Sequence, residues 1–95
     1  MPKGYLVAHI RVHDAEKFEV FKAMSGPAIG EYGGRVLARQ PNPDFREGAL
    51  RGLTIMIEFD SMDQARAFYE SEAYTAARAV REEAAETDLM LVQGL

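Results

Sequence analysis

Few side chains in this sequence can carry out acid–base or nucleophilic chemistry. Two of its 95 residues are histidines and none is a cysteine, which excludes disulfides, thiolate catalysis and cysteine-based metal centres. His9 can gain or lose a proton near neutral pH. Arg39 can bind a carboxylate through two parallel hydrogen bonds, and Glu58 can accept hydrogen bonds from a bound molecule.

If these three residues share one face of a sheet, their arrangement allows two interpretations. In the first, His9 is a catalytic acid or base, and Arg39 and Glu58 bind the ligand. In the second, they form a buried network of ion pairs where two chains meet, because buried charges need partners. Structural networks perturb ionisable groups as readily as active sites do, so the sequence leaves both interpretations open.

A metal site formed by the two histidines is not expected. His9 and His13 lie four residues apart, with Asp14 adjacent, and on a helix this spacing would place both rings on one face. On a strand, however, the same spacing separates them by about 13 Å. Protein metal sites generally need three or four ligands, so we predict no metal and no cofactor.

Three tyrosines are candidates for a ligand-binding rim: Tyr32, Tyr69 and Tyr74. Tyr74 also shares a helical face with Arg78 and Arg81, which follow it by four and seven residues. The alternative is an amphipathic helix surface on which arginine side chains lie over tyrosine rings. Four residues could surround a cavity mouth or form a seam between two chains: Tyr69, Ser71, Tyr74 and Arg78.

The composition indicates one ordinary globular domain spanning residues 1–95. Eleven basic residues against fifteen acidic ones give a net charge of −4, and 47% of the residues are hydrophobic. Nucleic acid and anionic membranes need a basic surface, so neither is an expected partner. There is no run of about 20 apolar residues and no hydrophobic leader, so a cytoplasmic protein is expected.

Four segments have the residue pattern of strands. Residues 5–12 and 34–40 alternate between the two faces of a strand. Residues 50–60 give the strongest strand pattern, and residues 89–92 a short terminal one. The second and third strands follow one another across a loop with turn-forming residues, which favours an antiparallel hairpin.

Two helical regions connect these strands. Asp14 is the predicted N-cap of the first. Gly26-Pro27 is expected to interrupt that helix and leave a short second piece, which ends at Gly33-Gly34. Ser61 is the predicted N-cap of the second region, and Ser71 that of a further helical piece.

The resulting order, β-α-β-β-α-β, predicts an α+β protein with the ferredoxin-like arrangement, a four-stranded antiparallel sheet with helices on one face. The expected helix-covered face comprises Leu6, Ala8, Ile10, Val12, Val36, Ala38, Leu53, Ile55, Ile57 and Phe59. The expected open face comprises Tyr5, Val7, His9, Arg11, Leu37, Arg39, Thr54, Met56 and Glu58.

The expected open face is more apolar than a sheet face in contact with water. Exposed apolar patches of this kind are typical of binding surfaces, and two copies related by a twofold axis could bury it. We therefore predict a homodimer through the open sheet face, a dimeric α+β barrel. The space in such an assembly is a natural cavity for a small molecule.

Short sequence elements in a fixed order extend this prediction. They are Lys3-Gly4-Tyr5, Tyr32-Gly33-Gly34-Arg35, Leu37-Ala38-Arg39, Ile57-Glu58-Phe59, Ser61, Ala65, Phe68-Tyr69, Ser71, Tyr74, Arg78, Arg81 and Asp88-Leu89-Met90-Leu91-Val92-Gln93-Gly94. In this ordered set, which spans essentially the whole chain, the sequence resembles the bacterial domain-of-unknown-function family numbered thirteen-thirty. The resemblance implies a dimeric α+β barrel of ferredoxin-like subunits, in a superfamily that includes small cofactor-independent monooxygenases, isomerases and haem-degrading enzymes. It implies no particular reaction, and His9 departs from the residue type expected at that position.

Three functional hypotheses follow. The first is a homodimer that binds a small anionic or carbonyl-bearing metabolite in the cavity between sheet and helices. Its expected ligand-binding residues are Arg39, Glu58, Tyr32, Tyr69 and Tyr74. The second is a cofactor-independent monooxygenase or isomerase in which His9 is the acid or base. The third is a non-catalytic structural dimer without a ligand.

Overall fold

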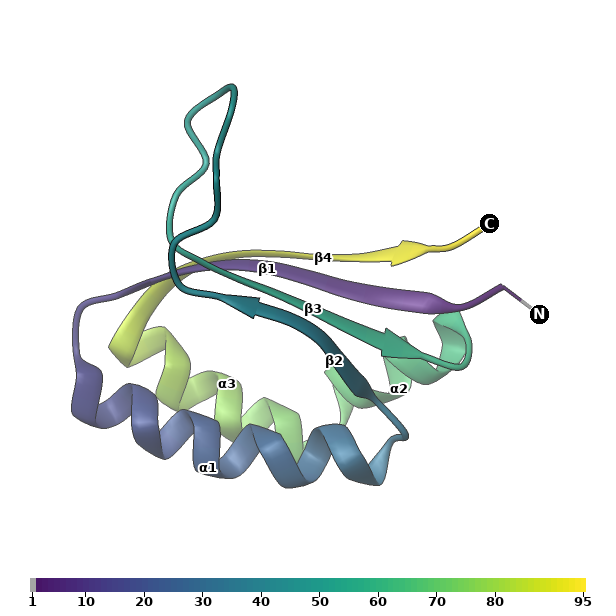
Figure 1. The fold of residues 1–95 in the computed structure, drawn as a ribbon. Helices are drawn as coiled ribbons and strands as arrows, with labels where there is room; N and C mark the ends of the chain where they lie inside the picture. Colours follow the sequence, from purple (N-terminus) through teal and green to yellow (C-terminus); the bar gives the residue numbers. More distant parts are fainter. Residues whose placement is uncertain (1) are drawn as a thin grey trace.

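The computed structural model describes residues 2–95, so Met1, the first residue of the predicted domain, lies outside the described residues. Its elements are β1 (Gly4–Val12), α1 (Ala15–Glu31), β2 (Arg35–Gln40), β3 (Leu53–Phe59), α2 (Met62–Glu70), α3 (Glu72–Ala84) and β4 (Ala85–Gln93). The strands form one antiparallel sheet in the order β2-β3-β1-β4. All three helices lie on one face of this sheet, and the loop between β2 and β3 projects on the other side (Figure 1). The predicted α+β, ferredoxin-like fold is confirmed.

The predicted helix N-caps are also confirmed. Asp14 accepts a hydrogen bond from the backbone N–H of Lys17 at 3.1 Å. The Ser61 and Ser71 hydroxyls accept equivalent bonds at the starts of α2 and α3, each at 3.1 Å. Such caps satisfy backbone donors that have no partner within the helix. No helix among residues 2–95 combines the length and apolarity needed to cross a bilayer.

The predicted interruption of the first helix at Gly26-Pro27 is wrong, because α1 continues through Pro27 to Glu31. A proline inside a helix removes one hydrogen bond and crowds the preceding turn, at a cost of about 3 kcal/mol. Burial on both sides of the proline offsets this cost: Phe21 before it and Ala28 after it are both in the core. Tertiary packing therefore overrides the local signal.

The end of α1 follows the predicted glycine signal. Gly33 has φ of 73°, in the left-handed region that favours glycine. Its N–H donates to the carbonyl of Gly30 at 3.1 Å, and the N–H of Gly34 donates to that of Ile29 at 2.8 Å. This pair of bonds is the Schellman motif, and it directs the chain from α1 into β2.

The helix-covered face of the sheet forms the core, and most of its predicted residues are there. Leu6, Ala8 and Ile10 of β1 are buried, together with Ile57 and Phe59 of β3. The two fully buried phenylalanines, Phe59 and Phe68, pack with ring centroids 5.1 Å apart. This contact joins α2 to the sheet.

The predicted faces of β2 are wrong beyond Val36, because the strand contains a β-bulge. Val36 pairs with Ile57, but Ala38 pairs with the next residue, Met56, so Leu37 is an additional residue. A one-residue insertion reverses the faces of every side chain that follows.

Two residues of β2 consequently change sides. Ala38 shares the open face with Met56, whereas Arg39 pairs with Ile55 and lies on the helix-covered side. Leu37 itself is 52% exposed. The open face, as the structure has it, comprises Tyr5, Val7, His9, Arg11, Arg35, Ala38, Gln40, Thr54, Met56, Glu58, Glu86, Asp88, Met90 and Val92.

The end of α1 yields a matched pair of stability predictions. Gly33→Ala should lower the free energy of unfolding by about 1–2 kcal/mol, because alanine is strained at positive φ. Gly30→Ala should raise it by about 0.5–1 kcal/mol, because Gly30 is helical and a Cβ there would meet no atom within 4 Å. Urea unfolding at one protein concentration measures both changes. Equal effects in the two variants would contradict the assigned helix end.

Candidate functional site

A cavity of about 60 Å³ lies between the sheet and the helices. Its lining residues are Leu6, Ala8, Ile10, Phe18, Phe21, Lys22, Ser25, Gly26, Ile29, Arg39, Ile55, Ile57, Phe68, Tyr74, Arg81 and Leu89. Lys22, Gly26 and Arg39 are exposed, so the cavity opens between α1 and β2. A largely apolar lining with a few polar groups is typical of small-molecule sites.

The inner wall of the cavity carries a buried cation. The Arg81 side chain, from α3, belongs to a residue only 5% exposed. Its Nη1 donates to the Tyr74 hydroxyl, and its guanidinium carbon lies 5.8 Å from the Phe21 ring centroid and 5.9 Å from that of Tyr74. Its Nε is buried without a hydrogen-bond partner, and no carboxylate among residues 2–95 lies within ion-pair distance. Aromatic rings compensate a buried charge only in part.

Two more cations stand at the cavity opening. Lys22 pairs with Glu19 on the outer surface of α1 at 2.6 Å. Arg39 has no ion pair within the part of the chain that the structure describes. The cavity lining contains no aspartate or glutamate, although acidic residues outnumber basic ones in the chain. The cavity is therefore electropositive within an acidic protein.

Tyr74 supplies a neutral hydroxyl beside Arg81. Burial raises the pKa of the Tyr74 phenol above its ordinary value, and Arg81 opposes this shift. The phenol therefore keeps its proton at neutral pH. Because its oxygen accepts a hydrogen bond from Arg81, its own O–H is the group that can donate to a bound molecule.

His9 lies on the opposite side of the sheet from this cavity. Its Nδ1 is hydrogen-bonded to the Thr54 hydroxyl at 3.0 Å, and its ring lies 6.4 Å from that of Phe45 in the loop between β2 and β3. It also lines a shallow hollow on the open face together with Leu50 and Met90. His9 therefore lies on the open face, away from the cavity.

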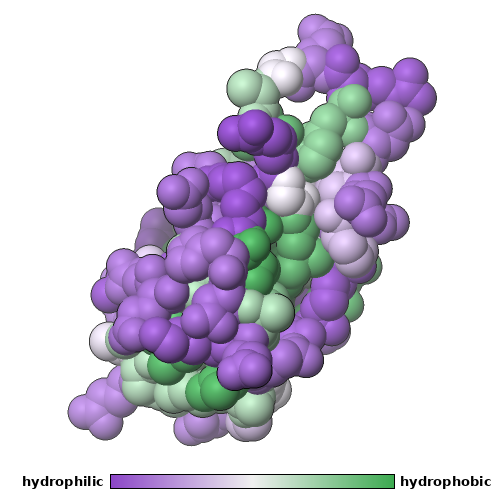
Figure 2. All heavy atoms as spheres, turned by 90° about the vertical axis from the view of Figure 1, so that its left-hand side faces the viewer, coloured by the Kyte–Doolittle hydropathy of each residue, from purple (hydrophilic) through white to green (hydrophobic). Residues whose placement is uncertain are grey.

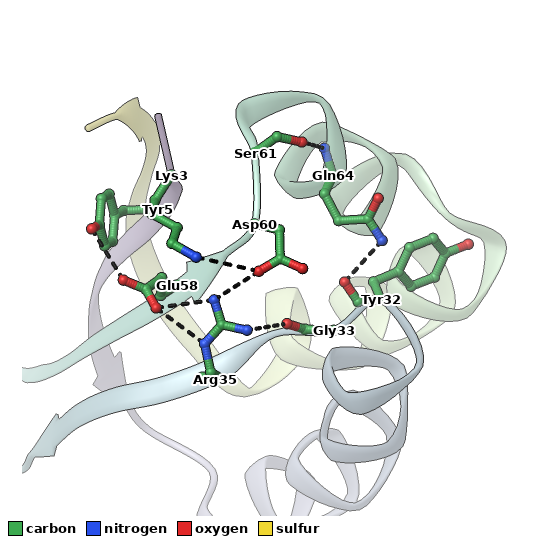
Figure 3. Close-up of polar contacts among 9 residues, drawn as sticks. All are labelled: Lys3, Tyr5, Tyr32, Gly33, Arg35, Glu58, Asp60, Ser61 and Gln64. Atoms are coloured by element: carbon green, nitrogen blue, oxygen red, sulfur yellow. Dashed lines mark hydrogen bonds and ion pairs between the residues drawn. The ribbon is translucent and has the colours of Figure 1, made fainter. Parts of the chain in front are cut away.

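Glu58 is held in a surface network at one end of the open face (Figure 3). Its carboxylate accepts from Arg35 Nε at 3.0 Å and from the Tyr5 hydroxyl at 3.1 Å. Arg35 Nη2 also donates to Asp60 at 3.1 Å, and Lys3 lies 3.5 Å from Asp60. The hydrogen bonds from Arg35 are the main cause that lowers the pKa of both Glu58 and Asp60.

The predicted grouping of His9, Arg39 and Glu58 on one sheet face is therefore wrong. The bulge at Leu37 moves Arg39 into the cavity wall, and Arg35, which was not predicted as a site residue, is the actual partner of Glu58. In the network at Glu58, each acidic side chain is paired with a basic one. Such pairing is what the interpretation as a network of ion pairs predicts.

The three predicted tyrosines have different positions. Tyr74 lines the cavity, whereas Tyr32 and Tyr69 do not. The Tyr32 ring packs against Phe68, with centroids 6.3 Å apart, and its backbone oxygen accepts from Gln64 (Figure 3). The Tyr69 hydroxyl accepts from Arg78 at 3.0 Å, and that arginine stacks on the Tyr69 ring.

Sequence reasoning missed the two buried polar residues of the cavity, Ser25 and Arg81. A signal existed for Arg81, because its spacing of seven from Tyr74 places both on one helical face. Ser25 gave no comparable signal. Among residues 2–95, no group of histidine, aspartate and glutamate side chains is arranged to hold a metal ion.

The structure has a four-stranded antiparallel sheet with helices on one face, a cavity between sheet and helices, and an open opposite face. This arrangement defines an α+β protein of ferredoxin-like fold. Residues 3–95 match the family model described as a domain of unknown function, DUF1330, and the chain belongs to this family. The family resemblance seen in the sequence is thereby confirmed. No curated protein matches the chain.

Solved structures share this fold at low sequence identity. A protein of unknown function from Rhodopseudomonas palustris superposes with a TM-score of 0.81 at 17% identity, over 99% of this chain and 83% of that one. SnoaB, a cofactor-independent oxygenase from Streptomyces nogalater, gives 0.68 at 13% identity, over 100% and 95%. A dimeric protein of unknown function and ferredoxin-like fold from Bacteroides fragilis gives 0.56 at 13% identity, over 96% and 95%. At these identities the likeness shows the fold alone.

The network at Glu58 predicts a specific pH dependence. A carboxyl group whose pKa is lower in the folded chain stabilises the fold above its unfolded-state pKa, near 4.3 for glutamate, and this contribution is lost as the pH falls through the folded value. The urea midpoint should therefore fall between pH 5 and pH 3, and Glu58→Gln should make that fall shallower.

The control for this prediction is Glu47→Gln, in the exposed loop between β2 and β3. It should follow the wild-type pH curve. Identical curves for the wild type and Glu58→Gln would show that the interaction with Arg35 contributes nothing to stability.

Proposed function

We propose that this protein binds a small anionic or carbonyl-bearing metabolite in the cavity between sheet and helices, and that it does so as a homodimer formed through the open sheet face. The observation that carries the proposal is the position of the buried polar residues. Among residues 2–95, Ser25 and Arg81 are the only buried residues with a polar or charged side chain apart from tyrosine, and both line this cavity. Arg81 Nε has no hydrogen-bond partner. Buried polar groups generally have partners, and a bound molecule would supply one to Arg81.

The open face supports the dimer. Met90 is 55% exposed, and Met56 and Val92 are also exposed, so the surface presents apolar side chains on β3 and β4. Figure 2 views the molecule from the end at which α1 begins, where hydrophobic atoms lie between hydrophilic sides and continue into the projecting loop. The structural neighbour from Bacteroides fragilis is described as dimeric. A twofold pairing of the open faces would bury Met56, Met90 and Val92.

A second candidate function is cofactor-independent oxygenation or isomerisation, favoured by the likeness in fold to SnoaB. Its site would include His9 as acid or base, with Glu58 on the same open face, and would lie where the partner chain covers that face. Turnover of an identified ligand that is lost in His9→Ala would support this candidate. A ligand-free structural dimer is the third candidate, and it requires that the cavity bind nothing.

Single substitutions on the open face test the dimer. Met90→Lys should convert the protein to a monomer in sedimentation experiments at micromolar concentration, because it places a charge in an apolar interface. Val20→Lys is the matched control, since Val20 is an equally exposed apolar residue on α1, away from the open face. It should leave the dimer intact. A wild-type monomer under these conditions would overturn the dimer proposal.

Filling the cavity tests the ligand. A screen of anionic and carbonyl-bearing metabolites by thermal unfolding should find compounds that raise the Tm, since a ligand at a hundredfold excess over its Kd stabilises the folded state by about 2.7 kcal/mol. Ser25→Leu should abolish that rise, because the larger side chain occupies the cavity, whereas Val20→Leu on the exposed side of the same helix should preserve it. An equal rise in Ser25→Leu would place the ligand elsewhere.

A further inference from the structure

The chemistry of the cavity wall narrows the class of ligand, provided that the proposed binding function holds. The buried wall carries one formal charge, the guanidinium of Arg81, and the described chain supplies no carboxylate to pair with it. Leaving a buried charge uncompensated is strongly unfavourable. A ligand that brings one negative charge into the cavity would remove this cost, and a neutral ligand would not.

The hydrogen-bonding groups match a carboxylate in particular. Arg81 Nη1 is already bonded to Tyr74, while Nε has no partner and is so buried that a ligand oxygen reaches it only after a shift of the side chain. Nε lies on the edge of the guanidinium that can bind both oxygens of one carboxylate together with a terminal nitrogen. The Tyr74 O–H provides a further donor beside it. These groups are all donors, so they favour an acceptor that carries no proton of its own.

The remaining lining limits the size and polarity of the rest of the ligand. Around Arg81 the wall is hydrocarbon, with Phe21, Phe68 and Ile10 among the contacting residues. The cavity of about 60 Å³ opens between α1 and β2, so it encloses part of a short carbon chain and leaves the rest at the opening. Arg39 and Lys22 stand at the opening, where they would attract an anion toward the cavity.

From these three features we propose that the cavity binds a short-chain monocarboxylate. Arg81 holds the carboxylate, the Tyr74 hydroxyl donates to it, and the hydrocarbon chain lies among Phe21, Phe68 and Ile10. Arg39 raises the rate of entry from solvent without holding the bound carboxylate. The competing partner of Arg81 is water in a second hollow, which Arg81 lines together with Thr87, Glu82 and Glu86. The Thr87 hydroxyl is also buried without a hydrogen-bond partner.

The test compares an acid with its neutral analogue on the unmodified protein. Sodium butyrate and butyramide are titrated at constant ionic strength, and binding is followed by the methyl NMR signals of Ile10 and Leu89, which line the cavity. Butyrate should shift these signals saturably, with a Kd at least about tenfold lower than that of butyramide. The methyl signals of Val20 and Val92, which do not line the cavity, should not move.

Replacing Arg81 and Arg39 one at a time then shows which of the two binds the carboxylate. Arg81→Met should weaken butyrate at least about tenfold while butyramide is unaffected, and Arg39→Met should weaken butyrate by less than about threefold. Without ligand, Arg81→Met should have a urea midpoint at or above that of the wild type, because an apolar side chain replaces an uncompensated buried charge. If Arg81→Met does not fold, the comparison of butyrate with butyramide on the wild type still decides the inference.

The outcomes separate this inference from the function on which it rests. The carboxylate inference is wrong if butyramide binds the wild type as tightly as butyrate, or if Arg81→Met binds butyrate normally. In either case the cavity binds small molecules, but the hydrogen-bond partner of Arg81 is water. If no compound of the metabolite screen moves the Ile10 and Leu89 signals, the proposed binding function fails as well.

Discussion

The arrangement of the three helices on a single face of the sheet is the constraint from which both candidate sites arise. Burial of apolar surface drives the helices onto the face that carries Leu6, Ile10 and Ile57. A single layer of helices cannot also cover the other face, so the methionines of β3 and β4 remain exposed. The same packing is incomplete beneath the sheet, where α1 and α3 leave a cavity against β1 and β3. One face is thus the proposed surface for a partner chain, and the other borders the proposed ligand cavity.

The cavity shows how a site can be built at the expense of stability. An apolar residue in place of Arg81 would fill the space beside Phe21 and Tyr74 without the cost of desolvating a charge. The aromatic rings and the Tyr74 hydroxyl partly offset that cost, but they leave Nε without a partner. Residues that break a local rule of stability without compensation are expected at functional sites. The surface network at Glu58 is the opposite case, since every charge in it has a partner.

The sequence predicts those features whose cause is local. Strand faces follow from alternation, and the caps Asp14, Ser61 and Ser71 follow from the ability of short polar side chains to bond to nearby backbone N–H groups. The end of α1 at Gly33 follows from the positive φ that glycine accepts. The error at Pro27 marks the limit of such reasoning, because burial of Phe21 and Ala28 outweighs the local effect of one proline.

Features that depend on pairing between segments could not be predicted in this way. The bulge at Leu37 has no local signal such as a glycine, and it is visible only when β2 is aligned with β3. Its consequence is nevertheless the largest for function, because it moves Arg39 from the open face to the cavity opening. The cavity itself exists only where α1, α3 and the sheet meet. A sequence pattern can place Arg81 and Tyr74 on one face of α3, but the absence of a carboxylate within ion-pair distance of Arg81 among residues 2–95 depends on all the other segments that pack there. The proposed chemistry of the cavity rests on this absence.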